Sequence, residues 1–245
     1  LNAQQYGGAV ANLEGTVNMN NVNITDVDID YRGYGEGFYG GTIYNRGNLT
    51  IDNSTLTNMR ADLGAAFSNI GGNLTIKNTN VSEAHAISEG GAIVNSNGGK
   101  ITMDNVNMTD MNAHLYGAAV ANLQGDVNMN NVNVTDVYIE YSGSQTGQFG
   151  GAIYNNDKLT VTNSSLTNLV GDFGAGLNNN GGTVTMDNVT ITNATAQTQG
   201  GAIYNHNDGE ITVTNSVMAD LISRDYGGAV ANSEGTALLD NVTIS

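Results

Sequence analysis

Apolar and polar residues alternate along short segments of this chain, and asparagine interrupts each alternating run. Residues 17–25 (VNMNNVNIT) are one such run, and residues 49–57 (LTIDNSTLT) are another. Because successive side chains of a strand point to opposite faces, a period of two predicts strands that bury one face. Similar runs recur along the whole chain, so the sequence predicts an all-β protein.

A six-residue motif recurs nine times and sets the length of each structural unit. It reads GGAIYN at residues 150–155 and 200–205. The nine copies begin at residues 7, 40, 64, 90, 117, 150, 174, 200 and 227, so the spacings are 33, 24, 26 and 27, and this series then repeats. Units of this length hold three short strands and three turns but no ordinary helix. We therefore expect a right-handed parallel β-helix, or β-solenoid, of nine coils of 24–33 residues.

The four spacings together define a four-coil superrepeat of about 110 residues, because self-similarity at a fixed period marks a repeated structural unit. Residues 6–45 and 116–155 are identical at 27 of 40 positions, which indicates a recent duplication. The sequence thus predicts one repeat domain over residues 1–245, with units at 1–110 and 111–220 and a partial unit at 221–245. We expect the chain to be a fragment of a longer array.

Apolar residues at equivalent places in the coils predict three inward-facing rows. The row from the GGAI motif is Val10, Ile43, Phe67, Ile93, Val120, Ile153, Leu177, Ile203 and Val230. The alternating runs give two more rows: Val17, Leu49, Leu74, Ile101, Val127, Leu159, Val184 and Ile211, and Met19, Ile51, Ile76, Met103, Met129, Val161, Met186, Val213 and Leu239. A single coil buries little apolar surface, so stacking must complete the core.

Asparagine fills two columns in all nine coils. The first column is Asn12, Asn45, Asn69, Asn95, Asn122, Asn155, Asn179, Asn205 and Asn232. The second is Asn21, Asn53, Asn78, Asn105, Asn131, Asn163, Asn188, Asn215 and Asn241. Asparagine tolerates the left-handed backbone of a sharp turn, and its amide can hydrogen-bond to the amide one coil away. We interpret both columns as structural ladders rather than as a ligand site.

Composition and charge narrow the range of partners. The chain has no cysteine, and its formal net charge is −16 with only seven lysine and arginine residues. Nucleic acids and anionic membrane surfaces both attract clustered basic residues, so we expect neither as a partner. No apolar run approaches the roughly 18 residues that a membrane-spanning helix needs. We therefore expect no direct membrane span.

The GGAI…N corner, followed by G-x-L-T-I-x-N-S, resembles the passenger repeats of bacterial autotransporter adhesins. The polymorphic outer-membrane protein type is the most similar, because its repeats carry GGAI and FxxN motifs. Residues 90–93, 150–153 and 200–203 read GGAI, whereas the FxxN motif is not kept. The resemblance spans the whole chain and implies a β-helix at the cell surface, outside the cell. It implies no particular receptor and no catalytic residue.

The two longest coils contain insertions, which are the candidate interaction sites. The first carries Tyr31, Arg32, Tyr34, Glu36 and Phe38, and the second carries Tyr138, Glu140 and Tyr141. Loops on a rigid scaffold often hold recognition residues, and tyrosine and arginine are enriched at interfaces. The insertions therefore predict contact with a receptor, a glycan or other copies of the chain. The alternative is that they are bulges tolerated at one corner.

Acidic side chains occupy one corner in three consecutive coils, at Glu83, Asp110 and Asp136. Like charges about 5 Å apart repel unless a cation lies between them, so calcium is a candidate ligand. The alternative is that these residues only cap a turn, as Asn58, Asn168 and Asn193 do at equivalent positions. We expect no other cofactor.

The sequence shows no catalytic constellation. Polysaccharide-cleaving enzymes need converging carboxylates and a base, whereas the basic residues here are spread over different coils and His85, His114 and His206 occupy dissimilar positions. We expect a structural or adhesive role outside the cell, as a stalk or passenger segment of a cell-surface adhesin that serves attachment or biofilm formation. A subunit of a self-assembling extracellular filament or sheath is the alternative, and a carbohydrate-active enzyme is the third hypothesis.

Overall fold

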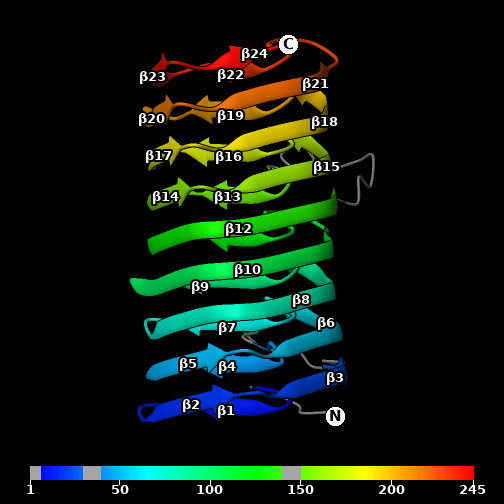
Figure 1. The fold of residues 1–245 in the computed structure, drawn as a ribbon, viewed down its shortest axis with the longest axis vertical. Helices are drawn as coiled ribbons and strands as arrows, with labels where there is room; N and C mark the ends of the chain where they lie inside the picture. The colour runs from blue at the N-terminus through cyan, green and yellow to red at the C-terminus, as the bar shows by residue number, and fades with distance from the viewer. Residues whose placement is uncertain (1–6, 30–39, 140–149) are drawn as a thin grey trace.

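The strands of this protein stack in parallel along one axis and form a β-solenoid (Figure 1). The computed structural model describes residues 7–29, 40–139 and 150–245, and these form 24 strands and no helix. The prediction of an all-β parallel solenoid is confirmed. None of the described residues belongs to a helix long and apolar enough to cross a membrane.

The GGAI motif forms the first sheet, in which nine short strands stack in chain order. The strands are β1 (Val10–Asn12), β4 (Ile43–Asn45), β7 (Phe67–Ile70), β9 (Ile93–Ser96), β11 (Val120–Asn122), β13 (Ile153–Asn155), β16 (Leu177–Asn180), β19 (Ile203–His206) and β22 (Val230–Asn232). Equivalent motif residues pair between neighbours, as Ile153 does with Leu177 and Asn155 with Asn179. The nine strands correspond to the nine copies of the motif.

The alternating runs form a second sheet of 15 strands that covers two sides of each coil. Its continuous path is β2 (Thr16–Asn20), β5 (Asn48–Asp52), β8 (Asn73–Glu89), β10 (Gly99–Ala113), β12 (Gly125–Ile139), β14 (Lys158–Thr162), β17 (Thr183–Asp187), β20 (Gly209–Thr214) and β23 (Gly235–Asp240). The other side is completed by β3 (Asn23–Asp28), β6 (Thr55–Leu63), β15 (Ser165–Phe173), β18 (Thr190–Gln199), β21 (Val217–Ser223) and β24 (Thr243–Ile244). The long strands β8, β10 and β12 pass from one side to the other without leaving the sheet.

One hydrophobic cluster fills the space between the sheets. Ile153, Leu166 and Val161 come from the three sides of one coil, and each is fully buried. Most residues of the three predicted inward rows belong to this cluster, and three more pack against it, so the assignment of these faces is confirmed. Leu239 is the exception, because its strand β23 has a neighbour on one side only and the residue is 39% exposed.

Two corners of the coil use left-handed backbone. All nine asparagines of the second column have φ between 46° and 56°. A further corner has φ between 50° and 61° in eight coils, at Asp26, Asn58, Glu83, Asp110, Asp136, Asn168, Asn193 and Asp220. Asparagine and aspartate adopt this conformation at low cost because their short polar side chains bond locally.

The first glycine of the motif forms another sharp turn. Gly117 has φ of 52°, and a Cβ built on it would lie 2.2 Å from the carbonyl oxygen of Val120. Only glycine fits such a position without displacing the backbone.

A pair of substitutions in one coil tests the face assignment. Ile153→Asp places a charge in the core and should lower the free energy of unfolding by about 3 kcal/mol or more. Thr167→Asp, on the outward side of β15, should cost less than about 1 kcal/mol. Urea denaturation measures both values, and equal losses would show that the inward and outward faces have been confused.

Candidate functional site

The first asparagine column forms an unbroken line of side-chain amides inside the rod. Each Nδ2 donates to the Oδ1 of the asparagine in the next coil, as Asn95 does to Asn122 (3.0 Å) and Asn122 to Asn155 (2.8 Å). All eight links run in this direction, at 2.6–3.0 Å. We call this column the inner ladder.

Backbone groups complete the hydrogen bonding of the inner ladder. The Nδ2 of Asn122 also donates to the carbonyl oxygen of Gly125 in its own turn (2.9 Å), and the other eight asparagines make an equivalent bond. Apart from Asn232 in the last coil, these side chains are at most 4% exposed. Each amide is therefore both buried and paired, which is the condition for keeping a polar group in a core.

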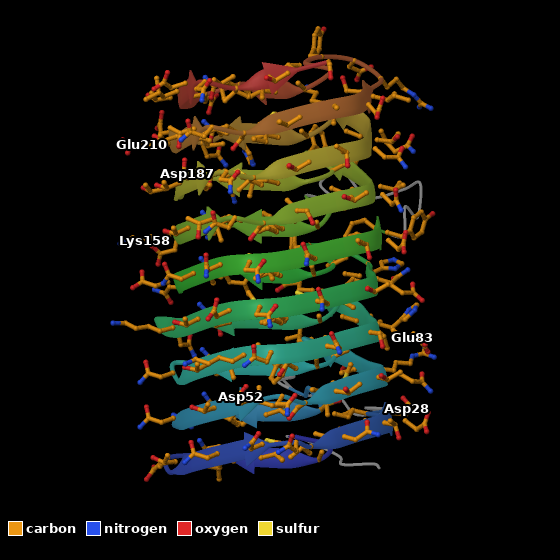
Figure 2. All side chains as sticks on the ribbon, viewed as in Figure 1. Asp28, Asp52, Glu83, Lys158, Asp187 and Glu210 are labelled. Atoms are coloured by element: carbon orange, nitrogen blue, oxygen red, sulfur yellow. The ribbon has the colours of Figure 1, made fainter. Side chains whose placement is uncertain are left out.

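The second asparagine column forms an outer ladder that runs in the opposite direction. Asn105 donates back to Asn78 (2.8 Å), and Asn131 donates back to Asn105 (3.2 Å). Three of the eight links go instead to a neighbouring side chain: Asn78 to Asp52, Asn163 to Asn130 and Asn215 to Asp187. Figure 2 shows Asp52 and Asp187 on the outside of the rod. All nine asparagines are exposed, so water competes for these bonds.

The sequence predicted a left-handed turn and an amide ladder for both columns, and only the second column has both. The left-handed backbone predicted for each column occurs in the second column, and none of the first-column asparagines has positive φ. That part of the prediction is wrong for the inner ladder. Its asparagines lie in the strands of the first sheet, where extended backbone points every second side chain inward.

The predicted acidic corner has the geometry of a turn. Glu83, Asp110 and Asp136 have φ of 53°, 61° and 55°, and the Oδ1 of Asp136 accepts a bond from the Nδ2 of Asn168 (2.8 Å). Within the described ranges, no three histidine, aspartate or glutamate side chains are grouped so that they could hold a metal ion. Calcium binding by this trio stays a prediction.

Most of the predicted interaction residues lie outside the described residues: Tyr31, Arg32, Tyr34, Glu36, Phe38, Glu140 and Tyr141. Tyr138 is described, near the end of β12, where it pairs in register with Asn112 and Val170. Its side chain is 47% exposed on the outward side of the sheet. The ring is thus accessible to a partner, and the interaction role of the insertions stays a prediction.

Two histidines in dissimilar coil positions come together in the structure. His85 of β8 and His114, just after β10, line one hollow together with Arg60 of β6. Since Asn112 is the residue that pairs with His85, His114 follows that pairing by two residues, just past the end of β10. The proximity of the two histidines could be predicted from the sequence only by aligning neighbouring coils residue by residue.

Burial raises the pKa of two carboxyl groups, Glu89 at the end of β8 and Asp172 in β15. The hydroxyl of Thr198 donates to Asp172 and partly offsets the effect of burial on its pKa. These carboxyls lie three coils apart, or roughly 14 Å at the usual strand spacing. The paired carboxylates of glycoside hydrolases are about 5–10 Å apart, so Glu89 and Asp172 do not form such a pair.

Comparison with protein-family models found none that matches this chain, and a search of curated protein sequences found no match either.

The inner ladder should contribute far more to stability than exposed amide bonds do. Asn122→Ala removes links to both neighbouring coils and leaves buried partners unpaired, so we expect a loss of about 2–4 kcal/mol in the free energy of unfolding. Asn133→Ala in the same coil removes bonds to Asn107 (3.0 Å) and Ser165 (2.8 Å) on the exposed side and should cost less than about 1 kcal/mol. Chemical denaturation gives both values. A loss at Asn122 no larger than that at Asn133 would contradict a stabilising inner ladder.

Proposed function

We propose that this chain is an extracellular β-solenoid with a structural and adhesive role, acting as a stalk or passenger segment of a cell-surface adhesin in attachment or biofilm formation. The observation that carries the proposal is the regular rod, whose interior is filled by apolar rows and by the inner ladder. At a strand spacing of about 4.8 Å, nine coils extend for roughly 40 Å. A rod built by repetition holds a surface at a distance without needing a unique site.

The outward faces support a contact role. Hydroxyl and amide side chains follow one another from coil to coil, as in the pairs Thr57 with Ser82 (3.1 Å) and Thr167 with Thr192 (3.3 Å). Asn107 and Asn133 continue this polar surface with an amide bond of 3.0 Å. Such side chains hydrogen-bond readily to the hydroxyls of glycans and carry no net charge. The resemblance to autotransporter passengers is consistent with this role.

A self-assembling filament or sheath is the second candidate. Similar surfaces recur with each four-coil superrepeat, and the hydroxyl strip that includes Thr135 and Thr109 has one residue per strand. A neighbouring rod presents the same spacing and could pack alongside in register. The net charge of −16 opposes this packing at low salt, but the repulsion is screened beyond about 8 Å at physiological ionic strength.

Adhesion of coated beads separates these functions. Beads carrying the purified chain would be washed over glass coated with mucin, with the chain itself or with albumin, and electron microscopy would show whether the free chain forms filaments. The adhesive role predicts saturable retention on mucin above the albumin background, with the chain present as single rods. Denatured chain on the beads is the control and should not be retained.

Two other outcomes would change the conclusion. Retention on chain-coated glass alone, together with ordered filaments, would replace the adhesive role by the filament. Retention at the albumin level on every surface, with no filaments, would contradict both candidates.

A further inference from the structure

A hollow of about 590 Å³ opens on the outward side of the second sheet, where β6, β8 and β10 approach the end of their coils. Arg60, His85 and Asn112, one from each strand, line the hollow together with Asn58, Ile87 and His114. In Figure 2 the labels of Asp28 and Glu83 mark the side of the rod where the hollow lies, because Asp28 pairs with Arg60 and Glu83 lies two residues before His85. None of these lining residues belongs to the inner ladder or to the predicted loops.

The register of the sheet places Arg60, His85 and Asn112 in a row. Arg60 pairs with His85, and His85 pairs with Asn112, so their backbones are one strand spacing apart, about 4.8 Å. The residues on either side of each are buried: Met59 and Ala61, Ala84 and Ala86, Met111 and Ala113 are at most 5% exposed. The core thus fixes the backbone beneath the hollow, and little ordering is needed to bind a ligand there.

The hollow brings basic side chains together. The chain has seven lysine and arginine residues and three histidines, and one arginine and two histidines meet here. A guanidinium beside an imidazole donates several hydrogen bonds to a carboxylate or sulfate oxygen. Acidic neighbours are present, because Asp28 pairs with Arg60 in register and Glu83 precedes His85 by two residues. A single anionic group therefore suits the site better than a polyanion.

The duplication within the chain provides an internal comparison. The superrepeat maps Arg60, His85 and Asn112 onto Val170, Thr195 and Ile222, which also pair along one row. Beneath the central position the buried residues are retained, since Ala84 and Ala86 correspond to Ala194 and Ala196. The scaffold thus accepts neutral side chains at these positions, and its folding does not require the basic group of the first unit.

We propose that this hollow binds an acidic sugar, with the carboxylate of the sugar on Arg60 and His85. The amides of Asn58 and Asn112 provide hydrogen-bonding groups for its hydroxyls, and Asn58 donates to Asp26 (2.6 Å), which leaves its own carbonyl oxygen as an acceptor. Ile87 is 51% exposed and offers an apolar surface to the face of the ring. The inference rests on the proposed adhesive function and names the class of glycan that this segment recognises.

Titration of the isolated chain with small ligands tests the site without any adhesion assay. Sodium glucuronate, glucose and sodium acetate would be added in turn while NMR follows the ring signals of His85 and His114. We expect saturable shifts with glucuronate, none with glucose, and at least about tenfold weaker binding of acetate, which lacks the hydroxyls. Equal binding of acetate and glucuronate, or saturation by glucose, would overturn the assignment to an acidic sugar.

Variants taken from the second unit test the residues. Arg60→Val combined with His85→Thr introduces the side chains that the second unit already carries, so the rod should fold, and the affinity for glucuronate should fall by about tenfold or more. Lys77→Gln is the matched control, because Lys77 is an exposed cation of the same strand β8 away from the hollow. Its affinity should be unchanged.

Three results would reject the site. These are no saturable binding of glucuronate by the unaltered chain, an equal loss of affinity in the control, and full affinity in the double variant. The bead assay stays separate from these results, because retention on mucin without glucuronate binding would remove this site and leave the adhesive role in place. Loss of retention with intact glucuronate binding would do the reverse.

Discussion

The rest of the structure depends on pairing the amides of the inner ladder. A primary amide inside an apolar core costs several kcal/mol unless its donors and acceptor are all bonded. Here each Nδ2 up to that of Asn205 serves at least one backbone carbonyl and the next asparagine, and each Oδ1 inside the stack accepts from the asparagine before it. This is possible only when successive coils have their asparagines in register. The amide that is costly when unpaired therefore fixes the alignment of the coils, and the apolar rows can then fill the core.

Variation in coil length is accommodated where the ladder does not constrain the chain. The spacings of 24–33 residues differ before the glycine pair, whereas the segment from the motif to the second asparagine column stays nearly constant in length. The left-handed corner of the second asparagine column repeats in every coil, with φ near 50° at a fixed position, and so returns the chain to the same register. Recognition groups such as Arg60 and His85 lie on the more variable side, close to the exposed corner.

Much of the fold was predictable because the repeat supplies the same information nine times. The period of two predicts the strands, and the predicted apolar rows are correct up to Val213. Leu239 is exposed because its strand pairs on one side only. Alternation alone could not predict that Tyr154 and Tyr204 are buried at 6% and 8% exposure, because they point away from the core and pack against Tyr116 and Phe173. The direction of each ladder also depends on amide orientation, which no sequence pattern specifies.

The hollow was missed for a related physical reason. Arg60 and His85 belong to different coils and are distant along the chain, and only the strand register makes them neighbours. Interpreting the asparagine columns as structural was correct, but the sequence could not distinguish the buried column from the exposed one, since asparagine is common both in ladders and at left-handed corners. The distinction matters for function, because a rod stabilised from within leaves its outer faces available for contacts.

Hydrogen exchange of the asparagine side-chain amides measures whether the inner ladder holds neighbouring coils together. NMR can follow the Nδ2 protons of Asn95, Asn122 and Asn155 in the inner ladder and those of Asn105 and Asn131 in the outer ladder. Protons held in a buried ladder exchange only when the coils separate, whereas exposed ones exchange without such opening. A buried inner ladder predicts strong protection of the inner protons, lost in the unfolded chain, and little protection of the outer ones. Equally fast exchange in both ladders would contradict it.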